Sequence, residues 1–332
     1  MDAFLPLAWA VIIGFCIIMY VILDGFTLGT AMLLPFLSSD ERDLAVSVIL
    51  PTWDGNQTWL ILGSAALYGA FPAAFSILLP VFYLPLFIMV TGLIFRGVVF
   101  EFRLKDRSHV HQWDKVFIIA SGIVALTQGL LLGDLVSGVE FTTSPLIQST
   151  TNLATPFSLF TAVSLIFGYL LLGASRLIYK TEGELQKKMY KLAPYLCLAV
   201  LLSIGVVSFW TPMISSIVYS RWFSHDNWIV LAILPYLSLI TMIIFLFSIK
   251  RRDEHLPFLC AVAFFAYAFI GYLISIYPYI VPYSLTIWQT AAPTGSLNFM
   301  MIGAVIMLPV LLVYTGYAYH IFRGKVQNVF HY

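Results

Sequence analysis

The chain has 332 residues, of which 61% are hydrophobic and only 10% are charged, and its mean hydropathy is +0.94. A soluble globular domain carries about 25% charged residues, so this composition excludes a water-soluble protein and favours one embedded in a bilayer. The 17 Lys and Arg residues nearly balance the 16 Asp and Glu residues, which argues against a nucleic-acid or strongly acidic partner.

Long apolar segments divide the chain into about nine candidate transmembrane helices, because roughly 20 apolar residues cross the hydrocarbon core. The second segment is the weakest, since the polar stretch PTWDGNQTW (51–59) interrupts it, and without it the count is eight. We therefore expect an all-α polytopic membrane protein with no large extramembrane domain. The predicted spans are residues 8–35, 44–70, 74–100, 116–137, 156–178, 193–217, 228–249, 257–277 and 298–321.

Basic residues predict the orientation, because cytoplasmic loops are enriched in Lys and Arg. With nine spans, four basic clusters fall on one side, and the loops between them on the other side contain few Lys or Arg. The pattern predicts a cytoplasmic C-terminus and an N-terminus outside. The four clusters are residues 103–115, 176–191, 250–255 and 323–325.

Five ionisable residues stand out inside or directly beside predicted spans, where a charge costs at least about 2.5–3.5 kcal/mol on insertion scales. They are Asp24, Asp54, Arg96, Glu101 and Asp134. Arg96 and Glu101 lie near the cytoplasmic end of the third span, and snorkelling of their side chains to the interface explains both. Asp134 is close to the outer end of its span, so we expect it at the interface.

Asp54 is the strongest candidate for function. On a helix, Gln57 and Thr58 share its face at i+3 and i+4, and a carboxyl, an amide and a hydroxyl in one strip can relay a proton. Pro51, just before this strip, predicts a kink or a freed carbonyl. The alternative is a structural role, in which Asp54 forms a buried ion pair with Arg96.

Two further residues allow both a structural and a functional interpretation. Asp24 is followed at i+3 by Thr27, which can hydrogen-bond to it, and by small packing residues at Gly25 and Gly29. Trp59 lies inside the second span near the polar strip, where it either lines an apolar passage or packs against neighbouring helices.

The positions of the six histidines argue against haem ligation by this chain. All six lie in loops or at span ends, whereas haem iron in a membrane bundle is normally held by a His within a helix. The three cysteines fall in apolar segments without metal-ligand spacing. We expect no haem ligands, no metal site and no self-contained active site on this chain.

Five segments carry motifs of a known family. They are YVILDGFTLGTAMLLPFL (20–37), PTWDGNQTWLILGSAALYGAFP (51–72), FYLPLFIMVTGLIFRGVVFEFR (82–103), WDKVF (113–117) and YPYIVPYSLTIW (277–288). Together they resemble subunit II of the cytochrome bd-type quinol oxidases, most specifically over residues 20–103. The compact length and the last motif resemble the cyanide-insensitive branch.

The resemblance implies a bacterial inner-membrane complex that oxidises quinol, reduces oxygen to water and takes its protons from the cytoplasm. It implies two b-type haems and haem d in the larger subunit I, with none ligated by this chain. The implied fold is two four-helix bundles plus a peripheral helix, which we place at about 8–137, 156–277 and 298–321 of one integral membrane domain. Implied partners besides subunit I are membrane lipid, a structural quinone and a small single-helix accessory subunit.

Residue roles follow from the resemblance by position. Asp54 matches the acid of the family's Trp-Asp-Gly-Asn motif, which resembles a proton-pathway entry. We assign Gln57 and Thr58, which share its helical face, and Asp24 to the same pathway. Trp59 matches a tryptophan associated with an oxygen route in some members.

Other matched positions carry less settled roles or depart from the family. Asp24 and Arg96 match recurrent charged positions, and we take Arg96 and Glu101 as structural charges. The family usually reads Asp-Gly-Phe-Asp where this chain has Thr27, and an Asp is common where Gln289 follows Trp288. Thr27 cannot be an ionisable relay.

Two other classes of function remain at this stage. A secondary transporter is typified by broken helices with buried acids, but it also predicts paired interrupted spans in both halves. The second half has no counterpart of WDGN. A purely structural membrane subunit differs from the oxidase interpretation only in the role of Asp54.

Overall fold

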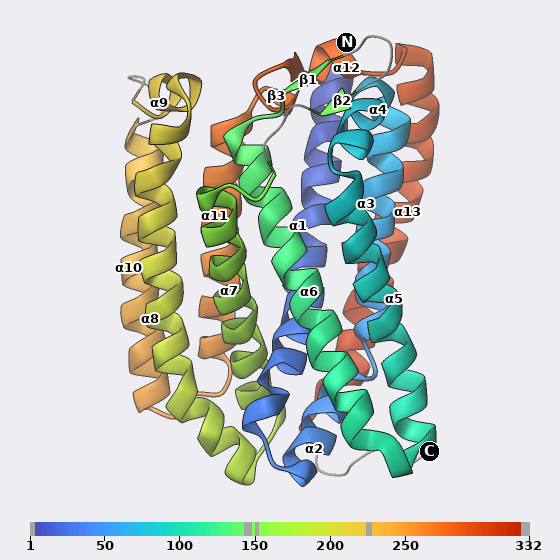
Figure 1. Cartoon of the computed structure of the whole chain (residues 1–332). Helices are drawn as coiled ribbons and strands as arrows, with labels where there is room; N and C mark the ends of the chain where they lie inside the picture. Colours follow the sequence, from blue (N-terminus) through green and yellow to red (C-terminus); the bar gives the residue numbers. More distant parts are fainter. Residues whose placement is uncertain (1–3, 143–147, 150–152, 224–227, 327–332) are drawn as a thin grey trace.

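A computed structural model describes residues 4–142, 148–149, 153–223 and 228–326. Within these residues, eight helices are long and apolar enough to cross a membrane. They run side by side between two ends of the molecule (Figure 1). The eight are α1 (Phe4–Leu33), α5 (Tyr83–Lys105), α6 (Val110–Ser137), α7 (Pro156–Lys180), α8 (Gly183–Ile214), α10 (Trp228–Lys250), α11 (Leu256–Ile276) and α13 (Thr294–Ile321).

Shorter elements connect these helices. The chain therefore has the expected all-α membrane fold, with short strands confined to one end (Figure 1). The remaining helices are η1 (Leu34–Phe36), α2 (Ser39–Ile49), α3 (Trp53–Ala70), α4 (Pro72–Val81), η2 (Arg107–His109), α9 (Ser216–Trp222) and α12 (Ile287–Thr290). Two antiparallel pairs are formed by β1 (Phe141–Thr142) with β2 (Gln148–Ser149) and by β3 (Tyr279–Val281) with β4 (Leu285–Thr286).

The prediction of one continuous span over 44–70 is wrong. Helix α2 ends at Ile49 and α3 begins at Trp53, because Pro51 has no amide hydrogen and its ring clashes with the preceding turn. The polar first turns of α3 also keep it outside the eight strongly apolar helices, although α3 packs along α1. The third predicted span is interrupted as well, since α4 and α5 are separate helices that meet at Phe82.

Helix α7 lies at the centre of the fold and packs against α1, α6, α8 and α11. Its contact with α1 is backbone on backbone: a Cβ added at Gly29 would lie 1.7 Å from the carbonyl oxygen of Tyr169. A Cβ at Gly173 would lie 2.5 Å from the amide nitrogen of Thr30. Small residues allow such close approach of membrane helices, so these glycines set the α1–α7 distance.

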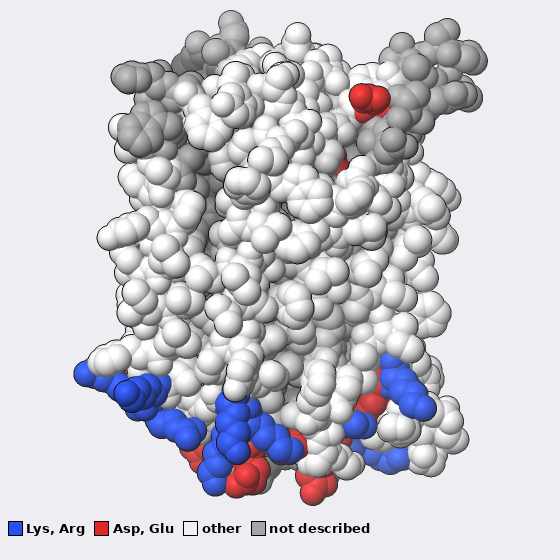
Figure 2. Space-filling model, turned by 60° about the vertical axis from the view of Figure 1, so that its left-hand side comes forward, with Lys and Arg blue, Asp and Glu red and all other residues white. Residues whose placement is uncertain are grey.

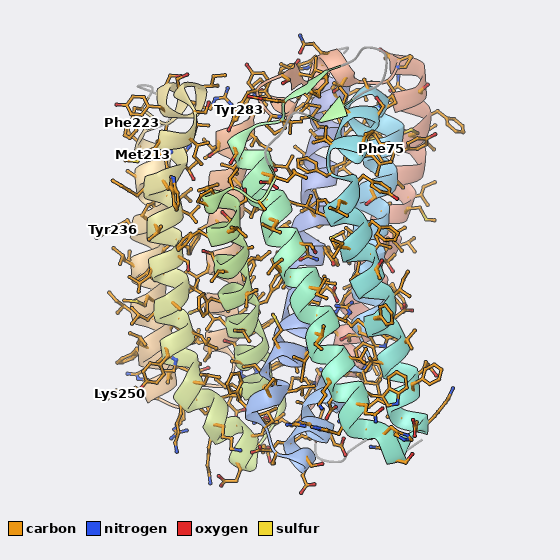
Figure 3. All side chains as sticks on the ribbon, viewed as in Figure 1. Phe75, Met213, Phe223, Tyr236, Lys250 and Tyr283 are labelled. Carbon is orange, nitrogen blue, oxygen red and sulfur yellow. The ribbon has the colours of Figure 1, made fainter. Side chains whose placement is uncertain are left out.

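Helix α13 is peripheral. Leu297 is its one buried residue among those described, and the helix lies at the opposite edge of the molecule from α8 and α10 (Figure 1). Large apolar side chains also point outward elsewhere, as Met213 and Tyr236 do in Figure 3, each 66% exposed. Such a surface is stable when lipid or another membrane subunit covers it.

Charged side chains are distributed unevenly. Lys and Arg gather at one end of the molecule, and the middle of the visible face carries none (Figure 2). This is the end where α2 lies (Figure 1). The four basic clusters predicted to share one side of the membrane therefore come together in space.

Candidate functional site

Asp24 and Arg96 form a fully buried ion pair that joins α1 to α5. The Arg96 Nη1 donates to Asp24 Oδ2 at 2.8 Å, and both side chains are 0% exposed. The alternative pairing of Arg96 with Asp54 is therefore wrong. Snorkelling of Arg96 to the interface is wrong as well, because a matching carboxylate on α1 balances the guanidinium inside the bundle.

Several polar atoms of this ion pair have no hydrogen-bond partner among the described residues. Asp24 Oδ1, Arg96 Nε and Nη2, and the buried hydroxyl of Thr27 have no hydrogen-bond partner there. Thr27 therefore does not hydrogen-bond to Asp24, contrary to the prediction from their spacing. Asp24 keeps one carboxylate oxygen available as an acceptor.

A second polar cluster lies beside this pair. Gln128 on α6 donates from Nε2 to the Tyr20 hydroxyl at 2.7 Å, and the Tyr169 hydroxyl donates to Gln128 Oε1 at 2.6 Å. Tyr20 lies one helical turn before Asp24 on the same face of α1. These bonds join α1, α6 and α7, and they were not predicted, because a single amide in an apolar span gives no partner from sequence.

Asp54 lies in the first turn of α3, not deep inside a span as predicted, and its side chain is exposed on the surface of the chain. Among the described residues, none hydrogen-bonds to it or forms an ion pair with it. Thr58, one turn later, is exposed on the same face, and Gln57 is half-buried. The predicted strip of Asp54 and Thr58 is thus present, and it faces out of this chain.

The two neighbours of Asp54 are held firmly. The Trp53 ring stacks on Phe100 of α5, with centroids 4.5 Å apart and planes 19° from parallel. Asn56 is 2% exposed and uses both ends of its amide. Its Nδ2 donates to the Leu23 carbonyl at 2.7 Å, and its Oδ1 accepts from the Tyr319 hydroxyl at 2.9 Å.

Trp59 is fully buried, at 0% exposed. It meets Phe15 edge to face, with centroids 5.7 Å apart and planes at 87°, and it clusters with Cys16 and Tyr20 of α1. This is the packing that one of the two sequence interpretations expected. Such an apolar environment is also what a route for a small apolar molecule requires.

The remaining predicted charges have different environments. Glu101 is exposed and pairs with Lys105 at 2.9 Å, as expected for a side chain at the interface. Asp134 lies near the end of α6, but it is 1% exposed and accepts a hydrogen bond from Ser158 at the start of α7. Asp134 therefore lies near the end of its helix, where the sequence placed it, and the start of α7 covers its carboxylate.

Gln289, at the position where the family commonly has an acid, caps a helix. Its side chain accepts from the Thr286 backbone amide at 2.8 Å and completes a capping box at the start of α12. A side-chain acceptor at this position satisfies an orphan amide, which accounts for Gln289 without ionisation.

An ion-pair network that the sequence reading missed lies at the basic end of the molecule. Arg103 of α5 is 2% exposed and binds Asp114 of α6 and Asp43 of α2, each at 2.7 Å. Nearby, hydrogen bonds from Ser108, His109 and Trp113 lower the pKa of Asp106 from 3.8 to about 2. Sequence spacing gave no sign that these charges meet.

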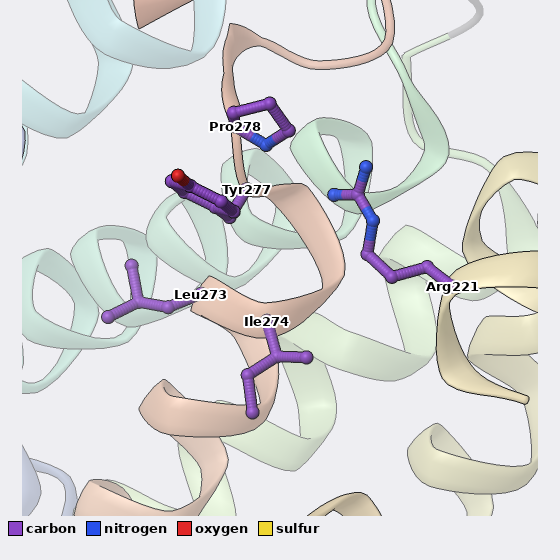
Figure 4. A pocket seen from close by; sticks show the side chains of 5 residues that line it. All are labelled: Arg221, Leu273, Ile274, Tyr277 and Pro278. Carbon is purple, nitrogen blue, oxygen red and sulfur yellow. The ribbon is translucent and has the colours of Figure 1, made fainter. Parts of the chain in front are cut away.

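A cavity of about 510 Å³ lies between α9 and the end of α11 (Figure 4), at the end of the molecule opposite α2 (Figure 1). Its lining combines one cation with aliphatic and aromatic side chains, a composition common in ligand sites. Across the described residues, no group of three or more His, Cys, Asp or Glu side chains could hold a metal ion. The lining residues are Arg221, Leu273, Ile274, Tyr277 and Pro278.

The fold and the buried charges define a class: a polytopic all-α membrane subunit with polar groups inside its bundle. The family model for cytochrome bd terminal oxidase subunit II matches residues 5–322. The chain therefore belongs to the cytochrome bd terminal oxidase subunit II family, as its motifs indicated. It is a component of a bacterial inner-membrane oxidoreductase complex that also contains a subunit I.

Individual relatives agree with this family. Cytochrome bd-I ubiquinol oxidase subunit 2 of Escherichia coli K12 is 25% identical, covering 96% of this chain and 94% of the relative. Cytochrome bd ubiquinol oxidase subunit 2 of Bacillus subtilis is 26% identical, covering 96% of each. A chain in the structure of bd oxidase from Geobacillus thermodenitrificans superposes with a TM-score of 0.81 at 17% identity, covering 96% of this chain and 98% of that one. The secondary-transporter alternative has no support from these relatives.

Proposed function

We propose that the chain is the non-haem subunit of a quinol:oxygen oxidoreductase in the aerobic respiratory chain. In this proposal subunit I carries two b-type haems and haem d, and the complex oxidises quinol and reduces oxygen to water. The match of the family model over residues 5–322 supports the proposal. Two of the relatives are named ubiquinol oxidase subunits, which supports a quinol as the electron donor.

The basic end of the molecule is proposed to face the cytoplasm, with the C-terminus on that side and the N-terminus outside. The concentration of Lys and Arg at the end near α2 supports this orientation, because positive charge is retained on the cytoplasmic side during insertion. Protons drawn from the cytoplasm would then arrive at the end of the bundle where α3 begins.

The face formed by α3, α5 and α13 is proposed to dock subunit I. Asp54 opens on this face: Gly55 lies beside Tyr314 of α13, and Trp53 packs on α5 between Gly97 and Phe100. Lys105, at the charged end of α5, lies roughly 8–12 Å further along the helix axis at 1.5 Å per residue. An ionised carboxylate this far from the charged end of the helices has a high free-energy cost if lipid surrounds it. A protein partner that offers polar groups to Asp54 removes that cost.

Asp54 is proposed as the entry of the proton pathway, with Thr58 and Gln57 beside it and Asp24 further in. The observation that carries this role is an exposed carboxylate held between two anchored neighbours, Trp53 and Asn56. Asn56 binds the carbonyl of Leu23, the residue before Asp24, so the two acids belong to adjoining parts of α3 and α1.

Two further roles follow the family resemblance. Trp59 is proposed to line an apolar oxygen route, which its packing among Phe15 and Cys16 supports. The cavity beside Arg221 is proposed to hold the head of a structural quinone, because a cation can bind a carbonyl oxygen and the apolar lining suits the ring. A lipid and a small single-helix subunit complete the proposed partners.

Purification of the tagged chain in mild detergent tests the assignment. A larger polytopic chain and a haem d band in the reduced-minus-oxidised spectrum are expected to accompany it, whereas a colourless chain purified alone would contradict it. Asp54→Asn in the intact complex is expected to lower oxygen consumption about 100-fold or more, in the range typical of proton-transfer groups, with haem content unchanged. Normal turnover would overturn the proton-entry role, and loss of haem would indicate a structural one.

A further inference from the structure

The first turn of α3 is not fixed by its N-cap residue, and contacts with other helices hold it instead. Thr52, at the N-cap position, makes no side-chain hydrogen bond to the first turn, although such bonds normally fix helix starts. The Asn56 amide therefore carries much of this task, through the Leu23 carbonyl of α1 and the Tyr319 hydroxyl of α13. Whatever orients the Tyr319 hydroxyl also orients the turn that presents Asp54.

Tyr319 is in turn held by a buried cation. The guanidinium carbon of Arg176, on α7, lies 5.3 Å from the centre of the Tyr319 ring. It also faces Phe26 at 4.9 Å and Phe258 at 5.4 Å, and Arg176 is 6% exposed. Within the described residues no carboxylate pairs with Arg176, so aromatic faces supply its stabilisation, an interaction that strengthens when it is desolvated.

These contacts form a continuous chain from α7 to the surface. Arg176 fixes the Tyr319 ring, Tyr319 donates its hydroxyl hydrogen to Asn56, and Asn56 fixes the first turn of α3 against α1. Asp54 lies two residues before Asn56 and has no anchor of its own among the described residues. The direction in which the Asp54 carboxylate points is therefore set by the positions of its neighbours.

We propose that Tyr319 and Arg176 are positioning residues for Asp54 and act through Asn56. The inference rests on the proposed function of Asp54 as the proton entry and adds the groups that aim its carboxylate at subunit I. Without the Tyr319 hydroxyl, Asn56 Oδ1 is left buried and unsatisfied, so the first turn of α3 rearranges to find another donor. A displacement of about 1 Å is enough to lower turnover by up to about 100-fold.

Tyr319→Phe in the intact oxidase complex is the central test, and Tyr236→Phe is its matched control. Tyr236 on α10 is 66% exposed and lies at the opposite edge of the molecule from α13 (Figures 1 and 3). We expect Tyr319→Phe to lower kcat for quinol-driven oxygen consumption about tenfold, with KM for quinol and haem content unchanged, since neither the quinol site nor a haem ligand is touched. Tyr236→Phe is expected to match the wild type, and equal rates for the two variants would overturn the proposal.

An infrared measurement separates positioning from a general loss of structure. The carboxyl and carboxylate bands of Asp54 are assigned in reduced-minus-oxidised spectra by their loss in Asp54→Asn. We expect these bands to shift in Tyr319→Phe and to stay unchanged in Tyr236→Phe. Unshifted bands in Tyr319→Phe would overturn the positioning role, even if turnover fell.

Arg176→Met supplies a second and independent variant. It removes the cation from the Tyr319 ring, so it is expected to lower kcat in the same direction, and Arg176→Lys is expected to recover part of the loss. Because both residues act through Asn56, the double variant with Tyr319→Phe is expected to be no slower than the slower single variant. If the double variant instead lost kcat by the product of the two single losses, the two residues would not act through Asn56 together.

The two proposals fail in different ways. If Asp54→Asn retained normal turnover, the proton-entry function would fall, while the infrared shift in Tyr319→Phe would still decide the positioning role. If Asp54→Asn abolished turnover but Tyr319→Phe and Arg176→Met both behaved as the wild type, only the positioning role would fall.

Discussion

Removing the guanidinium of Arg96 while keeping Asp24 is the sharpest perturbation of the bundle interior. Both side chains are 0% exposed, and the 2.8 Å contact is the one ion pair that Asp24 makes within the described residues. In Arg96→Met the carboxyl would stay in the same apolar position without its counter-charge. It must then either remain charged at high cost or take up a proton.

The expected loss is large. Breaking a buried pair by removing one partner costs about 3–5 kcal/mol, whereas replacing both partners with apolar residues of similar volume is often close to neutral. At 1.4 kcal/mol per factor of ten, Arg96→Met is expected to lower the folded-to-unfolded ratio by about 10²- to 10⁴-fold. The double variant Asp24→Leu with Arg96→Met is expected to recover most of that stability.

The measurement is the rate at which the detergent-solubilised complex loses haem absorbance at a fixed elevated temperature, with assembly checked first by co-purification of subunit I. We expect Arg96→Met to be fastest, the wild type slowest, and the double variant close to the wild type. The reasoning would be refuted if the double variant were as unstable as Arg96→Met, because the cost would then lie in lost packing and not in an unpaired charge.

Two more outcomes follow from the geometry. Gly29→Ala places a methyl group 1.7 Å from the Tyr169 carbonyl oxygen, so it should destabilise the complex by at least about 1–3 kcal/mol. The control Gly205→Ala, whose added methyl group meets nothing within 4 Å, should leave stability unchanged or raise it slightly through helix propensity. Equal rates of heat inactivation for the two variants would contradict the close contact between α1 and α7. The pKa of Asp106 is lowered from 3.8 to about 2 in the folded state, so its ionised form contributes stability above about pH 4 that is lost as the pH falls through 2. Asp106→Asn should therefore be less stable than the wild type at neutral pH and converge with it near pH 2, and a gap that persisted there would exclude this linkage.

Much of the fold was predictable from sequence because bilayer thickness and backbone hydrogen bonding leave few options. Seven of the eight apolar helices overlap the predicted spans closely, whereas α5 begins at Tyr83 inside the span predicted over 74–100. The basic segments gather at one end. The prediction failed at 44–70, where Pro51 outweighed hydropathy and separated α2 from α3. Hydropathy measures transfer into lipid and does not register a missing amide hydrogen.

The candidate site was less predictable, because side-chain partners depend on how helices are rotated and spaced. Sequence identified Asp24, Arg96 and Asp54 as unusual, but it could not decide which acid meets the guanidinium. Asp24 and Arg96 are 72 positions apart, and they meet because α1 and α5 turn these faces toward each other. Asn56 was visible in the motif, yet its bonds to Leu23 and Tyr319 depend on α13 lying beside α3.

The sequence by itself determined that the chain is a membrane protein, which family it belongs to and which end of it is basic. These properties depend on composition, on span length and on residues close together in the chain. The tertiary structure alone decided that Asp54 is exposed, that Asp24 is paired with Arg96 and that Tyr319 reaches Asn56. Burial and pairing depend on distances between helices, and these distances are set at close contacts such as that of Gly29 with Tyr169.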